Sequence, residues 1–174
     1  MTPVLWIILG CLIGLTMSSA TFVWMMRHKM VVATRSERTF EETREALEAA
    51  VAAAKGWALP VDSWDLYERF RRKQLVPERF SRLKIYFLCN SALASRVLST
   101  VPVMAGIMPC SWAVYELDDG SVWISRMNIG MMALLFGGVV GEMMREVEEA
   151  DREFLTSATI RGRRQNQPYE DAAA

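Results

Sequence analysis

Trp112-Ala-Val-Tyr-Glu-Leu117 and Ser121-Val-Trp-Ile-Ser-Arg126 are two short runs rich in β-branched and aromatic residues. The residues between them, Asp118-Asp119-Gly120, are of the types that favour tight turns. Two such runs joined by turn residues are typical of a β-hairpin. The sequence therefore predicts an antiparallel pair of strands in the second half of the chain, around which the other elements are placed.

The sequence around this hairpin alternates between strand-like and helix-like patterns. Further strands are predicted at 30–34, 57–61 and 84–89, and helices at 40–55, 63–74, 91–98 and 130–154. Thr39 and Glu42 form a capping box before the first of these helices, Asp62 or Ser63 can cap the second, and Asn90 or Ser91 the third. This order predicts an α+β fold with a mainly antiparallel sheet and packed helices.

The chain opens with an uncharged run from residue 3 to residue 26. As a helix it would be roughly 36 Å long, enough to cross a hydrocarbon core of about 30 Å. Trp6 and Trp24 would lie roughly 27 Å apart along it, which suits indole rings at the two membrane interfaces. We therefore predict a transmembrane helix at 3–26, an α+β domain at 30–154 and a polar, disordered tail at 155–174.

Basic residues follow the apolar run at once, beginning with Arg27 and Lys29. The positive-inside rule places them in the cytoplasm, so we expect a single-pass protein of the bacterial inner membrane whose domain faces the cytoplasm. The alternative is a cleaved signal peptide, because residues 18–20 are small. That alternative is disfavoured, since the chain lacks a basic n-region and its apolar run continues past Ala20.

The composition argues against several classes of protein. Twenty lysines and arginines balance twenty acidic residues, so no overall positive field points to nucleic acid, and we expect no nucleic-acid partner. The three cysteines show no CxxC spacing, and the chain has a single histidine, which excludes a histidine-pair metal site. No glycine-rich phosphate loop of either common type is present.

Three stretches carry a resemblance to a known family: Phe87-Leu-Cys89-Asn90-Ser-Ala-Leu-Ala94, Met108-Pro-Cys110-Ser-Trp-Ala-Val-Tyr-Glu116 and Gly120-Ser-Val-Trp-Ile-Ser-Arg-Met127-Asn128. From about Met30 to Phe154 the chain resembles the domain of unknown function 302 family. It is most similar to a branch that has the Met-Pro-Cys-Ser-Trp-Ala-Val-Tyr-Glu run and is associated with sulfur-oxidising and other chemolithotrophic or phototrophic bacteria. The resemblance implies a compact α+β domain that can pair as a dimer, and it brings no catalytic activity.

Cys89 and Cys110 are the candidate reactive residues, because each lies at the end of a predicted strand. If those strands are antiparallel neighbours, the two thiols can meet and act as a redox pair or a sulfur carrier. They can also hold a soft ion such as Cu(I), with Met108, Met127 or Met131 as thioether ligands. We favour inert, buried thiols, since the cytoplasm is reducing. No cofactor is predicted, although haem or copper stays open.

Gly10, Gly14 and Ser18 recur at every fourth position of the apolar run. Such a strip of small residues lets another membrane helix approach closely, so we predict a helix-docking face. Ala133, Gly137 and Gly141 repeat this spacing in the last predicted helix.

The expected partners are membrane lipids and an integral membrane protein or a second copy of the chain. Trp6, Trp24, Arg27 and Lys29 are the predicted contacts with the membrane interface. The favoured interpretation is a non-catalytic accessory or assembly subunit of a larger membrane complex of energy metabolism. The alternative is a thiol-dependent redox or sulfur-handling protein that uses Cys89 and Cys110.

Overall fold

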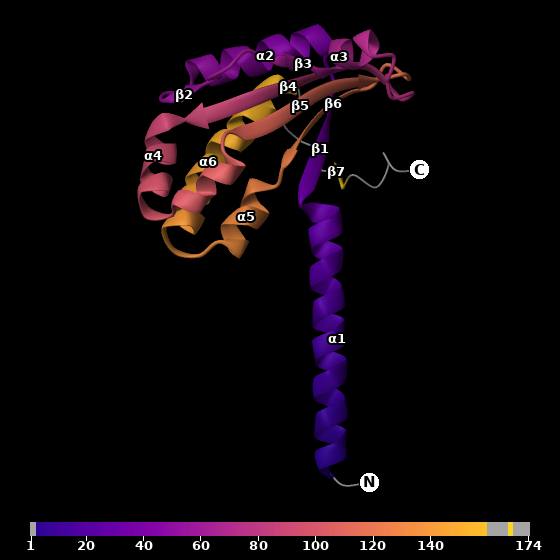
Figure 1. Cartoon of the computed structure of the whole chain (residues 1–174), viewed down its shortest axis with the longest axis vertical. Coiled ribbons are helices and arrows are strands. Elements are labelled where there is room, and N and C mark those ends of the chain that lie inside the picture. The colour runs from indigo at the N-terminus through magenta and orange to yellow at the C-terminus, as the bar shows by residue number, and fades with distance from the viewer. Residues whose placement is uncertain (1–2, 160–166, 169–174) are drawn as a thin grey trace.

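The computed structural model describes residues 3–159 and 167–168, and it has the shape of a head on a long stalk (Figure 1). The stalk is one helix, α1 (Pro3–Lys29), which leads directly into the first strand of the head, β1 (Val31–Ser36). No residue of α1 is buried against the described part of the chain. By length and composition α1 is the one described helix that can cross a membrane, a test that a signal sequence also passes.

The head contains an antiparallel sheet in the order β2-β4-β5-β6-β1-β7, with β3 also paired to β4. Its other strands are β2 (Trp57–Ala58), β3 (Trp64–Asp65), β4 (Phe80–Asn90), β5 (Cys110–Leu117), β6 (Val122–Met127) and β7 (Gln167–Pro168). The β5–β6 hairpin pairs Glu116 with Val122, and its turn contains Gly120 at φ +78°, a conformation that favours glycine. The predicted α+β class and the hairpin are confirmed.

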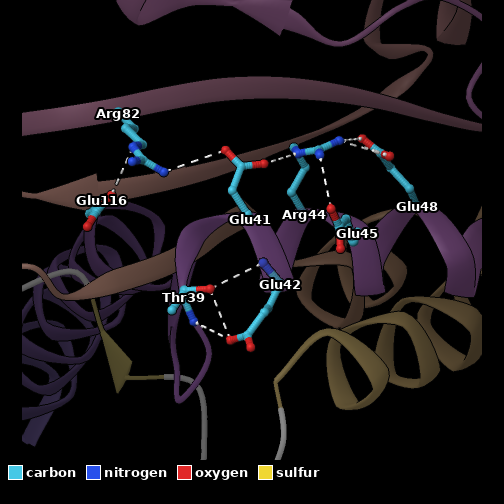
Figure 2. A network of polar contacts seen from close by, with 8 residues as sticks. All are labelled: Thr39, Glu41, Glu42, Arg44, Glu45, Glu48, Arg82 and Glu116. Carbon is cyan, nitrogen blue, oxygen red and sulfur yellow. Dashed lines mark hydrogen bonds and ion pairs between the residues drawn. The ribbon is translucent and has the colours of Figure 1, made fainter.

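Helices pack against one face of this sheet and beside the ends of β4 and β5. They are α2 (Phe40–Ala53), α3 (Leu66–Arg72), α4 (Ser91–Thr100), the 3-10 helix η1 (Pro102–Ile107), α5 (Ile129–Leu135) and α6 (Gly138–Ala158). The predicted capping box begins α2: the Thr39 N–H donates to Glu42 Oε2 over 3.0 Å, and the Glu42 N–H donates to Thr39 Oγ1 over 3.4 Å (Figure 2). Of the two predicted cap candidates for α4, Asn90 is the cap and Ser91 is the first residue of the helix.

Ion pairs between exposed side chains connect α2 to strands β4 and β5. Figure 2 shows Arg82 of β4 between Glu41 of α2 and Glu116 of β5, at 3.5 Å and 3.3 Å. On α2 itself Arg44 pairs with Glu41 and Glu48. Exposed pairs of this kind each stabilise a protein by about 1 kcal/mol or less. The packing of α2 on the sheet therefore depends mainly on its buried apolar side chains.

The apolar side chains form two clusters. The larger one lies where α2 and α6 pack against each other and against one face of the sheet; its largest fully buried members are Leu47, Tyr86, Leu88, Ile124, Val51 and Val114. The smaller one, the helical cluster, joins α4, η1, α5 and α6 through Val97, Met104, Ile129, Met132, Ala133, Val140, Met143 and Met144. Of the elements that form it, α5 lies on the side of the head toward which α1 extends (Figure 1).

The predicted helix at 130–154 is wrong as a single element. The chain leaves the helical conformation at Phe136 and Gly137, and Gly138 has φ +59°, so α5 and α6 are separate helices that pack against each other. The repeat of Ala133, Gly137 and Gly141 is therefore not a strip on one helix. A Cβ on Gly141 would clash with the carbonyl oxygen of Phe136, so this glycine serves the contact between α5 and α6.

Several other boundaries differ from the predictions. Strand β2 ends at Ala58 because Pro60, which has no N–H, follows closely. Asp65 caps α3 instead of Asp62 or Ser63, because Trp64 and Asp65 pair with β4 as β3. Strand β4 is longer than predicted and begins at Phe80.

The last helix also extends beyond its predicted end. Helix α6 ends at Ala158, which is fully buried, so residues 155–158 belong to the packed head and not to a disordered tail. Gln167 and Pro168 pair with β1 as β7. The rest of the predicted tail, 160–166 and 169–174, lies outside the described residues.

Candidate functional site

The small residues Gly10, Gly14 and Ser18 of α1 are exposed. Added side chains at Gly10 and Gly14 would meet nothing within 4 Å, and Ser18 is exposed on the same side of the helix. Nothing in the described chain occupies this strip. Its use for docking stays a prediction.

The predicted interface residues at the head end of α1 form a small cluster of their own. The rings of Trp24 and His28 lie 5.3 Å apart, and Lys29 Nζ lies 5.7 Å from the centre of the Trp24 ring. Arg27 is exposed beside them, while Trp6 is exposed near the other end of α1. This arrangement places an aromatic ring and basic groups together where α1 meets the head.

Asn128 connects the end of α1 to the helical cluster. Its Nδ2 donates to the Lys29 carbonyl oxygen over 3.0 Å, and its backbone N–H donates to the Met30 carbonyl oxygen over 2.8 Å. Its Oδ1 accepts from the Met131 N–H over 3.1 Å and so caps α5. One side chain therefore fixes the start of α5 to the end of α1.

An apolar cavity of about 90 Å³ lies beside the ends of β4 and β5, among α4, η1, α5 and α6. Sulfur atoms are unusually frequent in its lining, which includes Cys89, Cys110, Met108, Met127, Met132, Met143 and Met144. The remaining walls come from side chains such as Trp57, Leu88 and Trp112. A cavity of this size and character suits a small apolar group or a soft ion.

The two cysteines lie on antiparallel neighbouring strands, as their interpretation as a pair required. The register places Leu88 opposite Cys110, so Cys89 is one residue further along β4. Successive side chains of a strand point to opposite faces, yet the cavity at the strand ends touches both cysteines. Both thiols are free.

Cys110 is not set up as a ready nucleophile. Burial, with smaller effects from the nearby Asp151 and Cys89, raises the pKa of its thiol to about 11. Reactive cysteines have a lowered pKa, so Cys110 differs from them in its pKa although its side chain is partly exposed. The environment of Cys110 therefore favours an uncharged, packed thiol.

Of the three methionines suggested as thioether ligands, only two lie in the cavity with the cysteines. Met108 and Met127 line the cavity with the cysteines, whereas Met131 is buried in α5 and is not part of the lining. Within the described residues no three His, Cys, Asp or Glu side chains lie close enough to hold a metal ion. The cavity is also several-fold smaller than the roughly 300–1000 Å³ of pockets for drug-sized ligands, so it does not fit a haem.

A buried ion pair beside the cavity wall was not predicted. Arg126 Nε lies 2.7 Å from Asp151 Oδ2, and both side chains are about 5% exposed. The Arg126 guanidinium also lies 5.5 Å from the centre of the Trp112 ring. Burial raises the pKa of Asp151 to about 6, while Arg126 and the Trp112 indole pull it the other way.

The sequence did contain a signal for this pair. Asp151 falls on the same helical stripe as Met144, Phe154 and Ala158, all of which are buried. Arg126 follows the buried Ile124 by two positions in β6, so it points to the same face. Charged residues at inward positions of a helix and a strand indicate an internal pair.

The comparisons with known proteins agree with the fold. The family model described as "Domain of unknown function DUF302" matches residues 32–158. A crystal structure of an uncharacterized conserved DUF302 protein from Bacillus stearothermophilus superposes with a TM-score of 0.64, covering 74% of this chain and 98% of the other, at 20% identity. At this identity the likeness shows the fold alone.

Among curated proteins, one from Aquifex aeolicus (strain VF5), named only as an uncharacterized protein, is 31% identical over 48 residues. That match covers 28% of this chain and spans about a third of the relative's length, 33%. The name of this relative carries no activity, substrate or partner.

Proposed function

This chain belongs to the DUF302 family, and from that premise we propose that it is a single-span, membrane-anchored accessory or assembly subunit of a larger membrane complex of energy metabolism, without catalytic activity of its own. The observation that carries this proposal is α1. It is a 27-residue helix, uncharged up to Met26, and none of its residues is buried in the described chain. An apolar helix of this length in water would be strongly unfavourable, and a bilayer provides the surroundings it lacks.

The proposed docking face is the strip of Gly10, Gly14 and Ser18. Its lack of side-chain bulk supports close approach of another membrane helix, from an integral membrane partner or a second copy. The basic residues Arg27 and Lys29 support a head on the cytoplasmic side of a bacterial inner membrane. The link to energy metabolism comes from the resemblance of the Met108–Glu116 run to its branch of the family.

The test is crosslinking in the native membrane. Gly10→Leu together with Gly14→Leu should abolish the crosslink to the partner, because the added side chains hold the helices apart. Ser19→Leu is the matched control, since Ser19 lies about 140° around the helix from the middle of the strip. Equal crosslinking in both variants would reject docking through this strip.

The second candidate is a thiol-dependent redox or sulfur-handling protein. One observation favours it: Cys89 and Cys110 line the same cavity. The raised pKa of Cys110 opposes it, because a thiolate is the reactive form. The two candidates differ in the reactivity that they require of the folded protein's thiols.

A further inference from the structure

Five large apolar side chains are exposed on elements that pack together in the helical cluster. They belong to η1, α5 and the start of α6, and we call them the apolar edge: Val103, Ile107, Leu134, Leu135 and Val139. Leu134 is 87% exposed and Val103 80% exposed, so they are among the most exposed apolar side chains of the head. Single exposed apolar side chains are common, whereas a group of them on neighbouring elements marks an interaction surface.

The apolar edge is held together by the packing behind it. Met104 of η1, Met132 of α5 and Val140 of α6 all belong to the helical cluster, so the three elements form one packed unit. Ile107 also lines the sulfur-rich cavity, which therefore lies directly behind the edge.

The edge is fixed close to the end of α1. Asn128 binds the Lys29 carbonyl oxygen and caps α5. Helix α5 has only seven residues, about 10 Å of helix, so its exposed end at Leu134 lies within that reach of Asn128. Figure 1 shows α5 and the turn after it at the level of the top of α1, on the side of the head toward which α1 extends.

The charge pattern matches a lipid surface. No charged residue occurs from 97 to 115 or from 127 to 141, the two segments that supply the edge. The nearby end of α1 carries Arg27 and Lys29, whose charges suit anionic headgroups. Apolar side chains flanked by basic residues are typical of surfaces that lie in the headgroup region of a bilayer.

We propose that the apolar edge rests in the headgroup region of the same bilayer that α1 spans, so that the head is held against the membrane at two points. This inference rests on the proposed membrane anchoring. The membrane-spanning helix brings the apolar edge close to the lipid. Asn128 fixes the position of α5, and with it the edge, relative to the end of α1.

The test uses the full chain in liposomes that contain a phospholipid with a photoactivatable diazirine near its headgroup. After irradiation, mass spectrometry maps the labelled peptides. We expect labelling of α1 and of peptides holding 102–107 and 134–139, at roughly fivefold or more above the peptide holding Leu75. Leu75 is the internal control, because it is 65% exposed and closely follows α3, which lies on the side of the head away from α1 (Figure 1).

Variants separate this inference from the anchoring itself. Leu134→Glu should reduce labelling of 134–139 to the level of the control peptide and leave α1 labelled, whereas Leu75→Glu should change neither. Labelling of α1 with an unlabelled edge would overturn this inference alone. A chain whose α1 stays unlabelled would overturn the proposed function. Circular dichroism checks that each variant is folded, which we expect because both side chains are exposed.

Discussion

The side chain of Asn128 donates to the carbonyl oxygen of Lys29 over 3.0 Å, across 99 residues of sequence. The same side chain caps α5 through the Met131 N–H. The end of the apolar helix and the start of α5 are therefore held by one amide group. This contact adds a second link between the head and α1, beside the direct connection of α1 to β1.

Two substitutions of Asn128 should separate its two roles. Asn128→Ala removes both the cap and the bond to Lys29 and should lower the free energy of unfolding of the head by about 2 kcal/mol. Asn128→Asp keeps a capping oxygen but has no N–H to donate, so we expect a loss of about 1 kcal/mol. Denaturant unfolding in detergent, followed by near-ultraviolet circular dichroism, measures both. An Asn128→Asp variant as stable as the natural chain would show that the bond to Lys29 contributes nothing, and equal losses in the two variants would show that the cap contributes nothing.

Asp151 should give the head a characteristic pH dependence. Its pKa is about 6 in the folded protein and has an ordinary value of 3.8, so between these values the folded protein keeps a proton that the unfolded chain has released. The contribution of Asp151 to the free energy of unfolding is therefore fully present below pH 3.8 and is lost as the pH rises through 6.

The matched variant for this effect is Asp151→Asn, whose amide does not titrate. The free energy of unfolding of the natural chain minus that of the variant should fall between about pH 4 and pH 6. Carboxylates with a lowered pKa, such as Glu41 and Asp119, act in the opposite direction but are common to both proteins and cancel. A difference that is flat or rises with pH would contradict the expected direction.

Cys110 should resist alkylation in the folded protein. With a pKa of about 11, only about one thiol in a thousand is ionised at pH 8, and the partial burial of the side chain slows the reagent further. Iodoacetamide followed by peptide mass spectrometry should modify Cys110 only after denaturation. Modification in the folded state as fast as in the unfolded chain would instead support the thiol-dependent function.

Gly141 should tolerate no side chain. Its Cβ would clash with the Phe136 carbonyl oxygen, so Gly141→Ala should lower the free energy of unfolding by about 1–3 kcal/mol. Gly106→Ala is the control, because a Cβ there would meet nothing within 4 Å. Thermal unfolding compares the two, and an unchanged melting temperature for Gly141→Ala would show that α5 and α6 can move apart freely.

The sequence predicted those elements whose local patterns agree with the tertiary structure. The β5–β6 hairpin, the capping box of Thr39 and the Asn90 cap all follow from residues close together in the chain. Strand β3 could not be predicted, because two residues, Trp64 and Asp65, become a strand only by pairing with β4. The break between α5 and α6 was missed because apolar residues continue across it, although Gly137 and Gly138 marked the place.

The candidate site was predictable to a similar extent. Cys89 and Cys110 line one cavity because they lie at adjacent ends of the antiparallel strands β4 and β5, an arrangement already considered from the sequence. The methionines were harder, since Met143 and Met144 reach the cavity only because α6 folds back against α5. The inward positions of Arg126 and Asp151 can be read from the sequence, but their pairing with each other depends on contact between α6 and β6, which no local pattern contains.

Native mass spectrometry of the protein, extracted from its own membrane by a C-terminal tag, tests the central claim most directly. We predict a chain that retains α1 and that is bound to an integral membrane protein or to a second copy. A chain beginning near Thr21, or an intact chain that is always alone, would contradict this claim.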